Sequence, residues 1–157
     1  MSLDTTLLRK CFPANPLVEE LGPDDIAFRG LPDTYWCRFY QPFKVWSPLT
    51  GEFEIPAGFL SDGASIFSEL YSLVLSDTDP RILFAAYGHD YIFSLQGILP
   101  NGTILTREQC NSCIGYWMGV LGAEQIKIDE VLLGLAIGSK KYWDASKPAA
   151  KVESATK

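Results

Sequence analysis

The sequence predicts an α+β fold, in which a small antiparallel β-sheet packs against three to four α-helices. Two observations support this prediction. Residues 34–55 are rich in aromatic and β-branched side chains, which favour strands. From residue 80 onward, apolar residues recur at the three- to four-residue spacing of amphipathic helices. The strands are therefore expected first along the chain, and most of the helices after them.

A β-hairpin is predicted over residues 43–55. Residues 47–51 read SPLTG, which is typical of a turn, and residues 52–55 alternate polar and apolar side chains as a half-buried strand does. Residues 1–33 contain four closely spaced prolines, which argue against a long helix. We expect an irregular arm there, with one short strand.

Four helical segments are predicted after the hairpin: residues 66–75, a segment that begins at residue 80, residues 106–121 and residues 128–142. Asp79 and Pro80 are a strong start signal, because aspartate is a good N-cap and proline is tolerated at the first helical position. Thr106 and Gln109 match a capping box at the start of the third segment.

The globular part of the chain is expected to be one domain over residues 1–143. With 157 residues, of which 47% are hydrophobic, the chain can bury one core. Residues 144–157 are dominated by Ala, Ser and Lys and are expected to be a disordered tail. Gly134 and Gly138 share one face of the last helix, and glycines at this spacing favour close packing against a neighbour.

Composition excludes some classes of partner. The net charge is −6 and no Lys/Arg cluster interrupts it, so nucleic acid is not expected as a direct partner. No apolar run approaches the ~20 residues that a transmembrane helix needs. The N-terminus lacks the apolar core of a signal peptide. We therefore expect the protein to stay in the cytoplasm where it is made, or to leave it inside a larger assembly.

The four cysteines are predicted to be buried free thiols. Cys110 and Cys113 have the spacing of half a zinc or redox motif, but Cys11 and Cys37 are isolated and supply no second pair. On a helix, Cys110 and Cys113 would share a face with Trp117, among buried apolar residues. Metal or redox use of these cysteines is the less favoured interpretation.

One region of the sequence combines the residue types that acid–base or metal chemistry needs. Asp62 lies between Ser61 and Gly63 in a tight turn, and the only histidine of the chain, His89, is followed directly by Asp90. On the predicted helix, His89 points where its apolar neighbours point, toward the interior or a pocket wall, and Asp90 borders the same place. These three residues are the first candidates for a functional site.

Two chemistries fit the candidates. In the first, Asp62, His89 and Asp90 bind a divalent cation, which lowers the pKa of a bound water and makes it a nucleophile. In the second, His89 is a general base with Ser65 as nucleophile. Arg107 and Asn111 lie four residues apart on one helix face, so both are expected to reach the same site.

A purely structural interpretation stays open beside these. A single histidine on an apolar helix face is most often a core residue whose hydrogen bonds are satisfied within the protein. Asp62 would then bond backbone N–H groups of its turn, and Asp90 would pair with Arg81 or Arg107. Such a buried network would hold the hairpin on the helices and carry no chemistry.

Two sequence motifs resemble a family of small phage and prophage proteins known as domain of unknown function 1353. The motifs are IPxGFxSDGASI at residues 55–66 and AAxxHDY at residues 85–91. The family typically has an aspartate where this chain has Asn111, and a proline where it has Phe67. The resemblance implies a phage origin, with the host cytoplasm or the virion as location and other phage proteins as partners.

The histidine–aspartate pair on a helix is also similar to that of secreted phospholipases A2, in which the two residues serve as base and calcium ligand. This chain has neither their glycine-rich calcium loop nor their dense disulfides. Two functions therefore remain open. The protein is either a phage-encoded hydrolase of a peptide, amide or ester bond, or a non-catalytic virion- or tail-associated module. In the second case, exposed aromatic residues within residues 35–46 would dock onto a partner.

Overall fold

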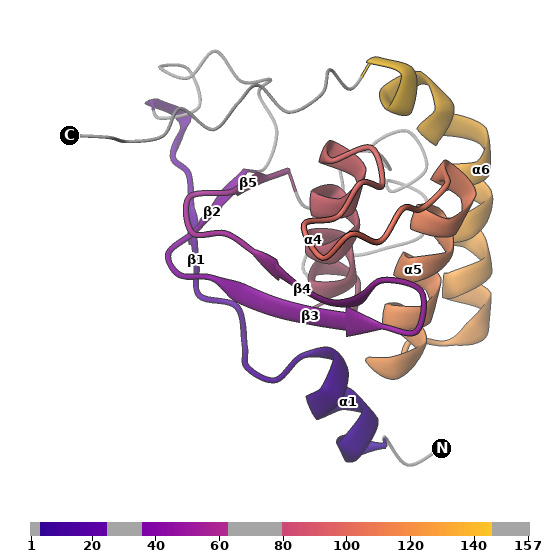
Figure 1. Cartoon of the computed structure of the whole chain (residues 1–157), viewed down its shortest axis with the longest axis horizontal. Coiled ribbons are helices and arrows are strands. Elements are labelled where there is room, and N and C mark those ends of the chain that lie inside the picture. The colour runs from indigo at the N-terminus through magenta and orange to yellow at the C-terminus, as the bar shows by residue number, and fades with distance from the viewer. Residues whose placement is uncertain (1–3, 25–35, 63–79, 146–157) are drawn as a thin grey trace.

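The computed structural model of the chain describes residues 4–24, 36–62 and 80–145, and Figure 1 shows their arrangement. Within these ranges the chain forms four helices and five strands, and the strands make two small antiparallel sheets. The predicted α+β class is confirmed. The helix expected over residues 66–75, the cap at Asp79 and the candidate nucleophile Ser65 lie outside the described residues.

The N-terminal arm is more regular than predicted, because it begins with a helix. Helix α1 spans Thr5–Cys11, and the Asp4 carboxylate caps it by accepting hydrogen bonds from the backbone N–H groups of Thr6 and Leu7. The helix ends before the first proline, Pro13, so the prolines limit its length but do not prevent it. The one short strand expected in the arm is β1, Val18–Glu20.

The predicted hairpin is confirmed with its bounds. Strands β3 (Phe43–Ser47) and β4 (Gly51–Ile55) pair antiparallel, with Val45 opposite Phe53. Phe43, Val45, Phe53 and Ile55 are buried, whereas the outer face carries half-buried Trp46 and the ion pair of Lys44 with Glu52. Alternation of apolar and polar residues along the strands therefore sets which face of the hairpin meets the core.

A second sheet carries the chain into the site. It contains β1, β2 (Cys37–Phe39) and β5 (Leu60–Ser61) in the order β1-β2-β5. In β5 the side chain of Ser61 is buried and that of Leu60 is half-buried. Strand β5 pairs with β2, which places Ser61 opposite Cys37, and β5 contacts helix α4. A polar side chain of β5 thus faces that helix.

Three helices form the other layer: α4 (Pro80–Ser94), α5 (Arg107–Val120) and α6 (Gln125–Ala145). Helix α5 lies between α4 and α6, and the capping box of Thr106 and Gln109 is present as predicted (Figure 1). Helix α6 is longer than expected, since it begins three residues earlier and includes Asp144 and Ala145. None of the described helices is long and apolar enough to cross a membrane.

The core lies between the sheets and the helices, and aromatic side chains fill much of it. Phe39 of β2 contacts Tyr87 of α4 edge-on, with 5.2 Å between the ring centroids. Trp117 of α5 is fully buried, and its indole Nε1 donates a hydrogen bond of 2.8 Å to the backbone carbonyl of Trp46 in β3. This bond ties the hairpin to the central helix.

Glycines permit close helix packing at two positions that the sequence analysis did not single out, whereas Gly138 has open space beside it in the described part of the chain. A Cβ on Gly138 would have nothing within 4 Å among the described residues, so close packing is not the reason for this glycine. A Cβ on Gly88 would instead lie 2.8 Å from the Trp117 ring, and one on Gly115 would lie 3.0 Å from Leu132. Gly88 therefore sets the approach of α4 to α5, and Gly115 that of α5 to α6.

Candidate functional site

His89 is buried among the apolar residues of helix α4. Ile82, Ala86 and Phe93 lie on the same face and are buried as well, so the predicted inward orientation of His89 is confirmed. The imidazole is 1% exposed and stacks on the Phe93 ring at 4.8 Å between centroids. Because an imidazole in such surroundings needs hydrogen-bond partners, its two nitrogens decide what the residue does.

The Nε2 atom of His89 is held by Asn111 of helix α5. It lies 3.1 Å from the side-chain oxygen Oδ1 of Asn111. An amide oxygen only accepts hydrogen bonds, so this contact places the imidazole proton on Nε2 and leaves Nδ1 with a free electron pair in neutral His89. The other end of the amide, Nδ2, donates a hydrogen bond of 3.0 Å to Ser139 of α6.

Arg107 and Asn111 converge as their spacing predicted, but on a third residue. The Nη1 atom of Arg107 donates a hydrogen bond of 3.3 Å to the same Ser139 hydroxyl that Asn111 contacts. Arg107 also pairs with its exposed neighbour Glu108. Arg107 therefore contributes to the site indirectly, and it is not the ion-pair partner of Asp90.

Asp90 lies between a hydroxyl group and the imidazole. The Ser61 hydroxyl of β5 donates a hydrogen bond to Asp90 Oδ2, while Asp90 Oδ1 is 3.9 Å from His89 Nδ1, too far for a direct hydrogen bond. Burial raises the pKa of Asp90 from 3.8 to about 7. The negative charge of Asp62 contributes to this rise, whereas His89 and the Ser61 hydrogen bond oppose it. At neutral pH both forms of this carboxyl are populated.

The candidate residues from the sequence thus differ in how directly they contact His89 and Asp90. His89, Asp90 and Asn111 are linked through contacts on α4 and α5, and Arg107 reaches them through Ser139. Asp62 follows β5 directly, is half-buried, and acts on Asp90 through its charge.

Two residues of this site were not among the candidates, Ser61 and Ser139. Ser139 is fully buried, and the sequence does hold a signal for it. It lies four and eight residues after Leu135 and Val131, which are core residues of the same helix face. A serine on such a face must find a polar partner. Ser61 could be found only by knowing that β5 turns this side of the strand toward α4.

The metal interpretation gains no support from the geometry. Across residues 4–24, 36–62 and 80–145, no group of three or more His, Cys, Asp or Glu side chains is arranged to hold a metal ion. The assignment of Asp62, His89 and Asp90 as ligands therefore stays a prediction. The described residues instead form a polar chain through the core, which joins β5, α4, α5 and α6.

The four cysteines are free and buried, as predicted. Burial raises the pKa of Cys110 to about 12 and that of Cys113 to about 11, so neither is a reactive thiolate at neutral pH.

Comparison of the chain with protein-family models, with curated proteins and with solved structures found no match. The class of protein is therefore defined by the fold and the polar chain alone: an α+β domain with a buried, ionisable Asp–His pair.

Proposed function

We propose that this protein is a hydrolase whose proton-transfer group is the carboxyl of Asp90. The observation that carries the proposal is the position of this carboxyl between the Ser61 hydroxyl and His89, with a pKa of about 7. A group that titrates near neutral pH can both take and return a proton during one reaction cycle. Strongly shifted groups of this kind are concentrated at functional sites.

In the proposed reaction, ionised Asp90 removes a proton from a water molecule as the water oxygen bonds to the carbonyl carbon of the substrate. The protonated carboxyl then returns this proton to the leaving nitrogen or oxygen as the bond to carbon breaks. Asp90 suits this task better than its neighbours, because its side chain is 10% exposed, against 1% for His89 and 1% for Ser61. His89 and Ser61 stabilise the ionised form.

Asn111 and Ser139 serve this reaction by fixing the orientation of the imidazole. Their hydrogen bonds hold the imidazole so that its Nδ1 faces Asp90. The substrate class proposed is a peptide, amide or ester. The likeness of residues 55–66 and 85–91 to phage proteins supports a phage-encoded enzyme that acts during entry or lysis, in the host cytoplasm or in the virion.

A second candidate function is a non-catalytic module that docks onto other phage proteins. The burial of His89 favours it, since a fully covered polar chain stabilises a fold without doing chemistry. The connection between β2 and β3 also exposes Tyr40, which lies beside exposed Leu17 and donates a backbone hydrogen bond to its carbonyl. These two side chains come from segments that a docking partner could reach.

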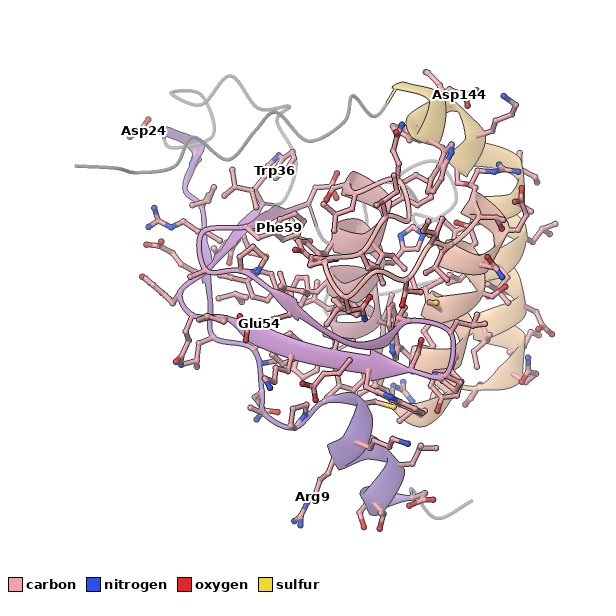
Figure 2. All side chains as sticks on the ribbon, viewed as in Figure 1. Arg9, Asp24, Trp36, Glu54, Phe59 and Asp144 are labelled. Carbon is pink, nitrogen blue, oxygen red and sulfur yellow. The ribbon has the colours of Figure 1, made fainter. Side chains whose placement is uncertain are left out.

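The test is a screen of ester, amide and peptide substrates, followed by the pH dependence of turnover. The rate for the substrate found should depend on a group that titrates near pH 7. Asp90→Asn should lower it at least about 100-fold, because an amide cannot carry the proton. Glu54→Gln, on the outer face of β4, is the matched control and should leave the rate unchanged (Figure 2).

Two outcomes would contradict the hydrolase proposal. One is a folded wild-type protein with no turnover of any substrate class. The other is turnover that Asp90→Asn leaves intact. Either result would favour the docking module, in which Asp90→Asn changes stability alone. Turnover measured after dialysis against a chelator, and again with added divalent cations, would test the predicted metal ligands separately.

A further inference from the structure

Helix α6 presents an apolar stripe to solvent on the side opposite the core. Ile126 and Leu133 are each 62% exposed and Ile137 is 73% exposed. At 3.6 residues per turn these three positions fall within about 40° of one another. The opposite face of the helix, which includes Val131 and Leu135, is buried. Helix α6 lies at one edge of the molecule, with α5 on its inner side (Figure 1).

The stripe has the spacing of one strand of a coiled coil. Positions 126, 130, 133, 137, 140 and 144 follow the alternating three- and four-residue steps that form a helix–helix seam. The apolar members are Ile126, Leu133 and Ile137, and two of the charged ones are Glu130 and Lys140. A charge in a seam is tolerated where the partner helix places an opposite charge against it.

We propose that a second copy of this chain docks antiparallel on α6. In an antiparallel pair whose twofold axis passes at the level of Leu135, each residue lies opposite the one equally far on the other side of 135. Leu133 of one copy then meets Ile137 of the other, and Glu130 meets Lys140. The alignment thus pairs apolar with apolar and acid with base at the four central seam positions, while Ile126 faces Asp144 at the two ends of the seam.

The charges within the seam decide between an antiparallel and a parallel pair. A parallel pair would place each residue against its own copy, with Glu130 on Glu130 and Lys140 on Lys140. Like charges across an interface are unfavourable, so the charge pattern selects the antiparallel arrangement.

The existing ion pairs of α6 do not prevent this docking. Glu130 pairs with Lys127 and Lys140 with Asp144, within one helix, and all four side chains are more than a third exposed. Exposed pairs of this kind contribute little and exchange partners readily. Asp144 lies at the end of α6 (Figure 2). The seam from 126 to 144 is about 27 Å long and holds three apolar residues, so a small interface and a weak dimer are expected.

Sedimentation of the full chain at increasing concentration tests the proposal. The mass should rise from the monomer value of 17.4 kDa toward twice that value between about 10 µM and 1 mM. Glu130→Lys or Lys140→Glu, each alone, should weaken self-association about tenfold, since each places like charges against each other twice. The double variant should recover it, because the opposite charges have only changed places.

Mixing the two single variants gives the sharpest result. Glu130→Lys carries two positive seam residues and Lys140→Glu two negative ones, so a mixture should associate more tightly than either variant does alone. Glu54→Lys changes the net charge as Glu130→Lys does, but on β4, and should leave the dimer intact. A wild-type mass that stays at 17.4 kDa at about 1 mM would overturn the proposal, and so would dimers that the seam charges do not affect.

Discussion

Asp90 shows how far the surroundings of one residue can alter its chemistry. An aspartate in water is ionised at neutral pH, but here burial raises its pKa to about 7. The neighbouring residue His89 and the Ser61 hydroxyl only partly offset this effect. The folded protein therefore holds a proton on Asp90 at pH values where the unfolded chain releases it.

This difference predicts how stability changes with pH. Between pH 4 and 7 the folded state binds one more proton at Asp90 than the unfolded state, so its contribution to the free energy of unfolding falls as pH rises. The expected loss is roughly 1.4 kcal/mol for each pH unit, with no further loss well above pH 7. Urea unfolding of wild type and of Asp90→Asn across pH 5 to 8 measures this loss. It is the change with pH in the difference between the free energies of unfolding of the two proteins.

The control for this measurement is Glu54→Gln. Glu54 is exposed on β4, so its side chain contacts water in both the folded and the unfolded state. The difference in free energy of unfolding between this variant and wild type should stay level over the same pH range. A difference between wild type and Asp90→Asn that is equally level would show that Asp90 is ionised in the folded protein at pH 5.

Among the elements, the contact between α4 and α5 depends on a residue with no side chain. Gly88 is buried against the ring of Trp117, and a single added methyl group would lie 2.8 Å from it. The Trp117 ring cannot easily move away, since its indole N–H is hydrogen-bonded to the backbone carbonyl of Trp46 in β3. The pairing of one glycine with one tryptophan thus sets how closely two helices and a hairpin pack.

Two glycine-to-alanine variants test this view of the helices. Gly88→Ala should lower the free energy of unfolding by about 2 kcal/mol, because the methyl group overpacks the core. Gly138→Ala on α6 meets no atom of the described residues within 4 Å and should raise it by about 0.5 kcal/mol through better helix propensity. Chemical denaturation of both variants gives the comparison. Equal effects of the two changes would mean that the Trp117 contact does not limit the packing.

At the scale of the whole molecule, the four thiols report on the integrity of the core. Cys11, Cys37, Cys110 and Cys113 are all fully buried and come from α1, β2 and α5. Burial is the largest cause that raises the pKa of each, in Cys37 to about 11. Both the burial of the four thiols and their low fraction of thiolate slow the reaction with external reagents.

We therefore expect a thiol reagent such as Ellman's reagent to react slowly with the native protein at pH 8. All four thiols should react once denaturant unfolds the chain, with one shared dependence on denaturant concentration. One thiol per chain that reacts within seconds under native conditions would contradict this expectation. It would also show that part of the core opens independently of the rest.

The elements that the sequence predicts well are those with local causes. The hairpin over residues 43–55 follows from a turn flanked by alternating residues, and α5 begins where its capping box predicts. Helix α1 was missed, because a seven-residue helix with one cap leaves a weak periodic signal beside several prolines.

For the candidate site, too, the sequence predicts the features that have local causes and misses the contacts between distant segments. Helical spacing was enough to point His89 inward, to set Asp90 beside it, and to place Arg107 and Asn111 on one face. Spacing could not say that Arg107 would bond Ser139, since this contact joins α5 to α6. Nor could it say that Asp90 would bond Ser61, which lies 29 residues earlier on a strand of the second sheet.

The amino-acid sequence by itself determined the α+β class, the buried state of the thiols and the inward direction of His89, because period, capping and burial preference act over a few neighbouring residues. The tertiary structure alone decided which groups meet at the site. The pKa of Asp90 depends on burial by elements distant in the sequence and on the charge of Asp62 across from it. Such a property exists only once the sheets and helices have packed around the carboxyl.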